Sequence, residues 1–222
     1  AGFQGHLKMG FREDGRLLAV DLYIVQENGP NQGFGDMGSA ASAVTITYTP
    51  LAMRYRGISV LTNTPPRGAP RGPGQNQMHT AIEPLLDKAA RELGVAPLDL
   101  RKINAPTQES RYGGNQGPIT SAYLREALEL GAQEFDWEAR RARSGDRNGP
   151  KVTGVGVGQA FHSAGSSGFD GLLRISPDGR LHIHTGVGNL GTYSYASTSR
   201  VAAEVLGSVS YTHLPLPTNR EV

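Results

Sequence analysis

Alternating and helical patterns of apolar residues divide the first half of this chain into short strands and amphipathic helices. Two partly alternating segments flank Glu13-Asp14-Gly15, which predicts a β-hairpin. Farther along, apolar side chains recur at helical spacing and predict a long helix. In this half we expect, in order, a hairpin within residues 6–25, a loop at 27–43, a strand at 55–61, and helices at 75–93 and 97–103.

The second half of the chain shows one clear hairpin and two further helices. Ser176-Pro177-Asp178-Gly179 separates two short apolar segments and predicts a tight turn between antiparallel strands. Ser121 is a residue type that caps helices, so we expect a helix to begin there. In this half we expect, in order, a helix at 121–135, strands at 152–162, 171–175 and 181–185, and a helix at 194–206. The predicted fold class is therefore α+β, with β-hairpins and packed amphipathic helices.

A charged segment that contains Gly and Pro, residues 140–150, is the best candidate for a linker. We therefore place a domain boundary near residue 148, with residues 1–148 in a first domain and residues 149–207 at the start of a second. Residues 208–222 lose the hydrophobic pattern and contain two prolines, so we expect a non-native tail there. The alternative for these last residues is a genuine disordered tail.

Composition excludes several classes of protein. The chain has no cysteine, which excludes disulfides, thiolate zinc sites and a cysteine nucleophile. A net charge of +2 over 222 residues is too small to favour nucleic acid as a partner. No apolar stretch approaches the length of a membrane span, and the first residues do not form a signal peptide. We expect a cytoplasmic protein, with the periplasm as the alternative.

A stiff loop precedes the long helix. Four prolines between residues 65 and 73 restrict the backbone, and three glycines between residues 68 and 74 permit close approach and positive φ. Arg67 and Arg71 lie in the same loop. This combination predicts a site for an anionic, flat or bulky ligand, and the alternative is a rigid surface turn.

A second glycine-rich turn, Gly186-Val187-Gly188-Asn189-Leu190-Gly191, lies between a predicted strand and a predicted helix. Unpaired N–H groups and the positive end of the helix favour an anion there. A dinucleotide site would need a second parallel strand and an acidic residue about 20 positions on, whereas Glu204 comes too early. A dinucleotide, another anionic cofactor and a purely structural turn stay open as alternatives.

Both glycine-rich segments resemble one family, the molybdopterin-binding large subunit of xanthine dehydrogenases and aldehyde oxidoreductases. The segment from Val155 to Gly207 is similar to the second cofactor-binding stretch of that family, and the resemblance covers most of residues 6–207. Four motifs of the first stretch occur here in the family's order: Thr62-Asn63, the glycine-rich segment Ala69–Gly74, Leu93-Gly94, and PLDLRKIN from Pro97 to Asn104.

The resemblance implies a molybdenum cofactor, which is molybdopterin with or without a cytosine dinucleotide. In this family the first loop passes under the metal centre with its backbone. The second turn carries a Gly-Gln pair in the family, and a threonine hydroxyl replaces the glutamine amide here. The cofactor-binding residues that the resemblance implies are Ala69, Pro70, Arg71, Gly72, Gly191 and Thr192.

Two further residues concern the substrate. Phe161 falls where the family places an aromatic ring at the substrate edge, and the alternative is a core phenylalanine on a strand. Pro73 takes the position of an aromatic residue that sandwiches purines in xanthine dehydrogenases. The arginine that purine-oxidising members carry upstream also has no counterpart, so we do not expect a purine substrate.

The resemblance implies an oxidoreductase that hydroxylates a C–H bond of an aldehyde or heteroaromatic ring with oxygen from water. Electrons would pass to iron–sulfur and FAD subunits or domains. The family's catalytic glutamate lies in a motif without a counterpart in this chain, so we expect no catalytic residue in it and no activity from it alone. The alternative function is a non-catalytic module that binds an anionic ligand or partner through Arg67, Arg71 and the turn at 186–191.

Other polar residues receive simpler interpretations. His182 and His184 share one face of a predicted strand, which forms either a metal site or a solvated face. Glu83, Asp87 and Glu92 are expected to be surface charges on the long helix.

Overall fold

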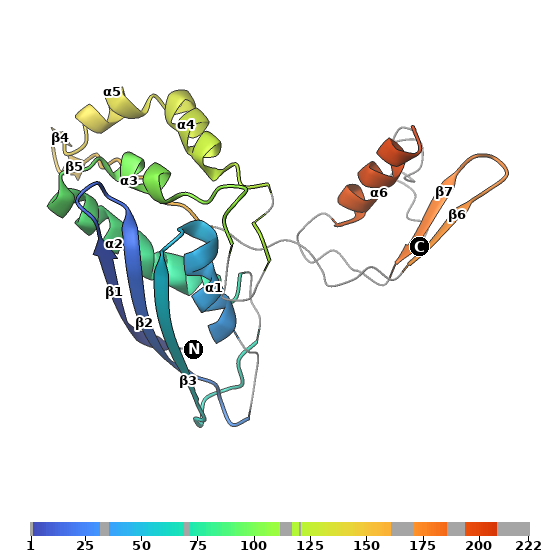
Figure 1. The fold of residues 1–222 in the computed structure, drawn as a ribbon, viewed down its shortest axis with the longest axis horizontal. Coiled ribbons are helices and arrows are strands. Elements are labelled where there is room, and N and C mark those ends of the chain that lie inside the picture. Colours follow the sequence, from blue (N-terminus) through green and yellow to red (C-terminus); the bar gives the residue numbers. More distant parts are fainter. Residues whose placement is uncertain are drawn as a thin grey trace. The chain divides into compact units, whose positions relative to one another are not determined.

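The computed structural model describes residues 2–31, 36–68, 72–111, 117–119, 121–160, 171–185 and 194–207. The chain forms two compact units, residues 1–163 and residues 164–222. Helices and small sheets occur together in the described parts, so the predicted α+β class is confirmed (Figure 1). The boundary near residue 148 concerns the family's domains and stays a prediction.

A three-stranded sheet organises the first unit. β1 (Phe3–Phe11) and β2 (Leu17–Glu27) form the predicted antiparallel hairpin. β3 (Ala52–Val60) confirms the next predicted strand and pairs with β2 in parallel. Alternate residues of the central strand β2 point into the core, because successive side chains of a strand face opposite sides. The buried members of this set are Leu17, Val20, Leu22 and Ile24.

A helix, α1 (Met37–Thr47), connects β2 to β3. The prediction of a loop at 27–43 is therefore wrong in its second half. Glycine, serine and β-branched residues lower the helix propensity of this segment and offset its three alanines, and its apolar residues show no clear helical period. Ala40, Ala43 and Val44 are nevertheless fully buried, and α1 packs on α2, so tertiary packing overrides the local preference. Parallel strands such as β2 and β3 also need a crossover of this kind.

Two further helices confirm their predicted positions. α2 (Gln75–Leu93) has the predicted bounds, and α3 (Pro97–Asn104) ends one residue later than predicted. Gly94 ends α2 with φ of +67°, the left-handed conformation in which glycine is favoured. The buried apolar side chains of α2 recur at helical spacing: Met78, Ile82, Leu86 and Ala90.

Asn104 ties the end of α3 to the hairpin turn. Its side chain is fully buried. Its Oδ1 accepts a hydrogen bond from the backbone N–H of Leu17 at 2.7 Å, and its Nδ2 donates to the carbonyl of Gly15 at 2.8 Å. Asn104, the last residue of the PLDLRKIN motif, therefore has a structural role in holding α3 against the hairpin turn.

Two short helices follow, α4 (Leu124–Glu134) and α5 (Trp137–Ala142). Ser121 does not cap α4: it has φ of +56°, and Tyr123 occupies the N-cap position, so the predicted cap is wrong. No side chain of α4 is buried, whereas Trp137 is 7% exposed.

Two-residue strands, β4 (Arg147–Asn148) and β5 (Lys151–Val152), form a small antiparallel pair. The strand predicted at 152–162 is not formed over its described part, because residues 153–160 have no regular secondary structure. Burial still alternates from Val155 to Ala160, so this segment keeps an extended character.

In the second unit, β6 (Gly171–Ile175) and β7 (Leu181–Thr185) form the predicted antiparallel hairpin. α6 (Ser194–Val205) confirms the last predicted helix. All side chains of β6 are exposed. Among the described helices of the whole chain, none is both long enough and apolar enough to cross a membrane.

Candidate functional site

The loop that precedes α2 has a backbone conformation that favours glycine. Gly72 and Gly74 have φ of +59° and +78°, and both are buried. A Cβ atom at Gly74 would lie 2.0 Å from the backbone carbonyl oxygen of Asp36. A Cβ atom at Gly72 would lie 2.9 Å from the side-chain oxygen of Asn76. The loop therefore passes tightly against the start of α1 and against the first turn of α2.

Arg67 lies in this loop with its charge paired inside the fold. Its Nη2 donates to Asp36 Oδ2 at 2.7 Å, and the two side chains are only 5% and 2% exposed. The guanidinium also lies 4.9 Å from the ring centre of Phe3, and Gln26 donates a further hydrogen bond to Asp36. The expectation that Arg67 binds an anionic ligand is wrong, because its buried charge already has a partner.

Two acceptor oxygens lie directly after the loop, in the first turn of α2. The Oε1 atoms of Gln75 and Gln77 are buried, and neither has a hydrogen-bond partner in the part of the chain that the structure describes. A buried acceptor without a partner costs about 1–3 kcal/mol. Side chains two positions apart on a helix point in different directions, and Gln77 faces β1, so Gln75 is the acceptor that suits an N–H donor of a ligand beside the loop. Neither glutamine can be picked out from the sequence, because polar residues in a first helical turn are a weak signal.

The structure describes only part of the predicted site. Among the predicted site residues, the structure describes Gly72 and Pro73, which are neighbours in the loop before α2. The roles of the remaining predicted residues, and the convergence of the two glycine-rich segments, stay predictions. The residues outside the described part are Ala69, Pro70, Arg71, Phe161, Gly191 and Thr192.

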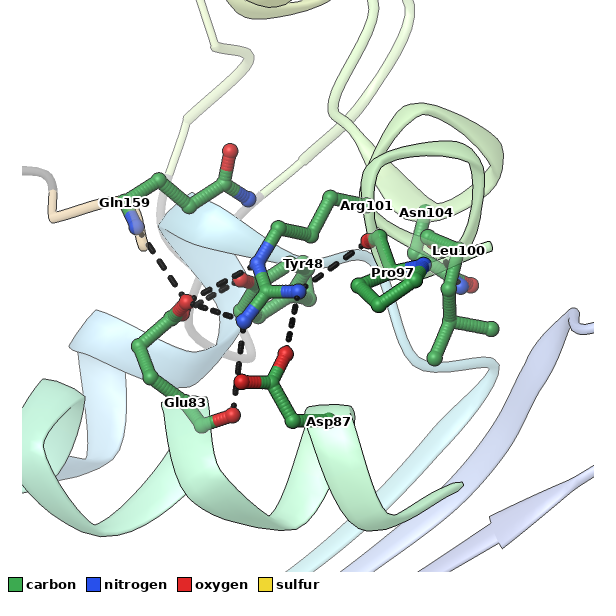
Figure 2. Close-up of polar contacts among 8 residues, drawn as sticks. All are labelled: Tyr48, Glu83, Asp87, Pro97, Leu100, Arg101, Asn104 and Gln159. Atoms are coloured by element: carbon green, nitrogen blue, oxygen red, sulfur yellow. Dashed lines mark hydrogen bonds and ion pairs between the residues drawn. The ribbon is translucent and has the colours of Figure 1, made fainter. Parts of the chain in front are cut away.

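Arg101 organises a second buried polar cluster, between α2 and α3 (Figure 2). Its side chain is fully buried, and its three nitrogen atoms all donate hydrogen bonds. Nε and Nη2 donate to Glu83 Oε2 at 2.9 and 2.8 Å, and Nη1 donates to Asp87 Oδ1 at 2.8 Å. Nη1 also donates to the carbonyl of Pro97 at 3.0 Å. Removing one partner of such a buried pair costs about 3–5 kcal/mol, so the cluster clamps α3 onto α2.

Glu83 is not the surface charge that we predicted, because its side chain is only 16% exposed, whereas Asp87 is 38% exposed and also pairs with Arg101. Glu83 Oε1 accepts a hydrogen bond from the Tyr48 hydroxyl, and Oε2 accepts one from the backbone N–H of Gln159 at 3.2 Å. The signal in the sequence was the spacing, because residues four apart share one face of a helix. The sequence could not show that Arg101 lies opposite that face.

The charges of this cluster shift two of its pKa values. Burial is the largest single influence and lowers the pKa of Arg101, but the negative charge of Glu83 and the hydrogen bonds to Glu83 and Asp87 together raise the pKa above its ordinary value. Burial, followed by the charge of Glu83, raises the pKa of Tyr48 far above its ordinary value. Tyr48 therefore stays a neutral hydrogen-bond donor, and Arg101 stays a cation.

The described histidines on β7 and α2 lie in no cluster that could hold a metal ion. The rings of His182 and His184 stack with their centres 6.4 Å apart on β7, which confirms that they share a face. His79 is buried, and its Nε2 lies 2.7 Å from the hydroxyl of Thr47. Within the described residues, no group of three or more His, Cys, Asp or Glu side chains could hold a metal ion.

Comparison with models of known protein families shows which kind of domain this chain contains. Residues 1–105 and residues 130–215 each match a family model described as a molybdopterin cofactor-binding domain. The two matches occur in the order that the sequence motifs predict. The first match contains the glycine-rich loop and the Arg101 cluster, so both features lie within a cofactor-binding domain.

Two sequence relatives and one solved structure are similar to this chain over most of its length. The chain is 30% identical over 212 residues to the xanthine dehydrogenase molybdenum-binding subunit of Escherichia coli O157:H7, covering 90% of this chain and 28% of that subunit. It is 28% identical to the aldehyde oxidoreductase molybdenum-binding subunit PaoC of the same organism, covering 91% of this chain and 27% of PaoC. The aldehyde oxidoreductase structure from Desulfovibrio gigas matches with a TM-score of 0.78 and 25% identity, over 95% of this chain and 24% of that one.

The chain belongs to the molybdopterin-binding subunits of the xanthine dehydrogenase and aldehyde oxidoreductase family. The predicted family is therefore confirmed. The chain spans about 28% of the length of the first of these relatives.

Proposed function

We propose that this chain supplies part of the molybdenum-cofactor site of an enzyme that hydroxylates an aldehyde or a heteroaromatic ring. The observation that carries the proposal is the buried Oε1 atom of Gln75, which has no hydrogen-bond partner in the described residues and directly follows the tightly packed glycine-rich loop at 72–74. The loop lies within the first matched cofactor-binding domain.

In this proposal the chain binds and orients the cofactor, chiefly through its backbone. The loop from Ala69 to Gly72 approaches the cofactor, and Gln75, directly after the loop, accepts a hydrogen bond from it. Gly191 and Thr192 contribute from the second domain. When bound, the molybdenum cofactor supplies the two-electron oxidation that adds an oxygen from water to a C–H bond.

Substrate would lie beside Phe161 and Pro73. The small ring of Pro73 offers less stacking surface than an aromatic residue, which favours an aldehyde or a small heteroaromatic compound over a purine. We assign no catalytic base to this chain. Iron–sulfur and FAD subunits or domains would accept the electrons. The proposed cofactor is molybdopterin, with or without a cytosine dinucleotide.

The alternative function is a non-catalytic module that binds an anionic partner through Arg67, Arg71 and the turn at 186–191. One of these three elements does not fit. Arg67 is bound to Asp36 in a buried ion pair, so its guanidinium does not face a partner. Arg71 and the turn at 186–191 lie outside the described residues.

The test is the cofactor content of the full-length protein. We expect molybdenum by mass spectrometry and a fluorescent pterin oxidation product from the purified protein. Gly72→Val should lower molybdenum content several-fold, because valine is strained at a φ of +59° and fills the space beside the loop. Gly94→Val is the matched control, since Gly94 also has positive φ but meets nothing within 4 Å. Molybdenum-free wild-type protein would contradict the proposal.

A further inference from the structure

Glu83 joins three segments of the chain that are far apart in sequence. Its carboxylate accepts hydrogen bonds from Tyr48 at the end of α1, from Arg101 in α3, and from the backbone N–H of Gln159 (Figure 2). Its side chain is 16% exposed, and that of Arg101 is fully buried. The carboxylate therefore acts as a nearly buried junction between these segments.

The junction connects the two matched domains. Glu83 lies within the first match, residues 1–105, and Gln159 lies within the second, residues 130–215. Residues 153–160 pair with none of the described strands, so individual contacts hold this extended segment in place. Val155 N–H donates to Ser144 Oγ at 3.0 Å, which holds the segment to its own domain, whereas Gln159 N–H holds it to α2.

Apolar contacts on the same segment support this arrangement. Gly156, Val157 and Gly158 line a hollow of about 250 Å³ together with Leu98 and Trp137. A Cβ atom at Gly158 would lie 3.6 Å from Glu83 Oε2, which is ordinary van der Waals contact. The segment therefore runs directly over the Glu83 carboxylate. Gln159, which makes the contact, comes two residues before the predicted substrate-edge residue Phe161.

We propose that Glu83 is a positioning residue, which fixes the segment at 155–160 of the second domain against α2 of the first through the N–H of Gln159. The functional part of this inference rests on the proposed function, because the second domain contributes to the cofactor site only if that proposal holds. Glu83 acts through the backbone and touches neither cofactor nor substrate.

Asp87 provides a matched control for this role. Both carboxylates lie on α2 and both accept hydrogen bonds from Arg101, but only Glu83 contacts Gln159. Glu83→Ala and Asp87→Ala therefore each remove one partner of the same buried cation. A purely structural role would give both variants the same effect on residues 155–160.

The experiment measures hydrogen–deuterium exchange of the full-length protein with residue-level fragmentation. We expect the Gln159 amide to exchange at least about tenfold faster in Glu83→Ala than in Asp87→Ala, since a hydrogen bond to a charged group is lost in only one of them. The Val155 amide, bound to Ser144, should be unchanged in both and serves as the internal reference. If Glu83→Ala does not fold, Glu83→Gln and Asp87→Asn replace the pair, with a smaller difference of the same sign.

Molybdenum content gives the second readout. We expect Glu83→Ala to lose molybdenum more than Asp87→Ala does, at equal protein concentration. Equal Gln159 exchange in the two variants, or faster exchange without loss of molybdenum, would overturn the inference. A wild-type protein without molybdenum would defeat the proposed function instead, and the exchange comparison on that protein would still decide whether Glu83 holds the segment.

Discussion

At the scale of single residues, two kinds of constraint shape this chain. Gly72 and Gly74 are needed for their backbone conformation, and Arg67 and Arg101 are needed for buried ion pairs. A glycine of the first kind can be recognised in a sequence from its neighbours. The partner of a buried arginine cannot, because any carboxylate in the chain is a candidate until the fold selects one.

Gly74→Ala should destabilise the protein more than Gly94→Ala. Both positions have positive φ, which costs about 1–2 kcal/mol with a Cβ atom. Only at Gly74 would the Cβ also lie 2.0 Å from a backbone carbonyl, and overpacking of this kind adds about 1–3 kcal/mol. Urea unfolding measures both variants. Equal free energies of unfolding would show that the backbone near Asp36 moves aside easily.

At the scale of elements, polar contacts hold the helices in place beside the apolar core. Arg101 clamps α3 to α2, Asn104 ties α3 to the hairpin turn, and Tyr48 links the end of α1 to α2 through Glu83. Each contact comes from the last turn of a helix or from the residue after it. Hydrophobic packing sets which elements meet, and these contacts join neighbouring elements near the ends of the helices.

The Tyr48 contact predicts a pH dependence. Below pH of about 10 the hydroxyl is protonated in both the folded and the unfolded chain, so its contribution to stability is constant. Above that pH the unfolded chain loses the proton while the folded chain retains it, because burial and Glu83 raise the folded-state pKa. The free energy of unfolding should then fall by about 1.4 kcal/mol per pH unit from this group.

Tyr48→Phe isolates this effect, since phenylalanine has no proton to lose. The difference in free energy of unfolding between wild type and variant, measured in urea at pH 9, 10 and 11, should shrink only above pH of about 10. A constant difference over this range would mean that the hydroxyl titrates normally in the folded protein.

At the scale of the whole molecule, the chain divides into two compact units with different degrees of burial. The sheet, α1 and α2 of the first unit enclose an extended apolar core. In the second unit all residues of β6 are exposed, including Leu172, Leu173 and Ile175. The chain spans about 28% of the first relative's length, and we expect the exposed side chains of β6 to pack on other parts of the full-length protein.

Deleting residues 208–222 should leave the thermal midpoint unchanged. The reason is the loss of hydrophobic pattern after Gly207, which offers no apolar face for packing. A contribution of about 1 kcal/mol would shift the midpoint of a protein of this size by about 2–4 °C, which scanning calorimetry detects. A drop of several degrees would show that these residues pack on the fold.

The sequence by itself determined the elements whose signal is local. The helix at 75–93, the proline-started helix after it and both hairpins follow from periodicity and turn residues within one segment. The motifs also indicated the family, because a motif is a property of the chain order. These features needed no knowledge of what lies opposite them in space.

Only the tertiary structure decided the rest. α1 is stabilised because Ala40, Ala43 and Val44 become buried, although its apolar pattern gives no clear helical period. Glu83 turned from an expected surface charge into a junction because α3 brings Arg101 to it across 18 positions of sequence. Burial and the choice of partner depend on every element that surrounds a residue, so no local pattern can contain them.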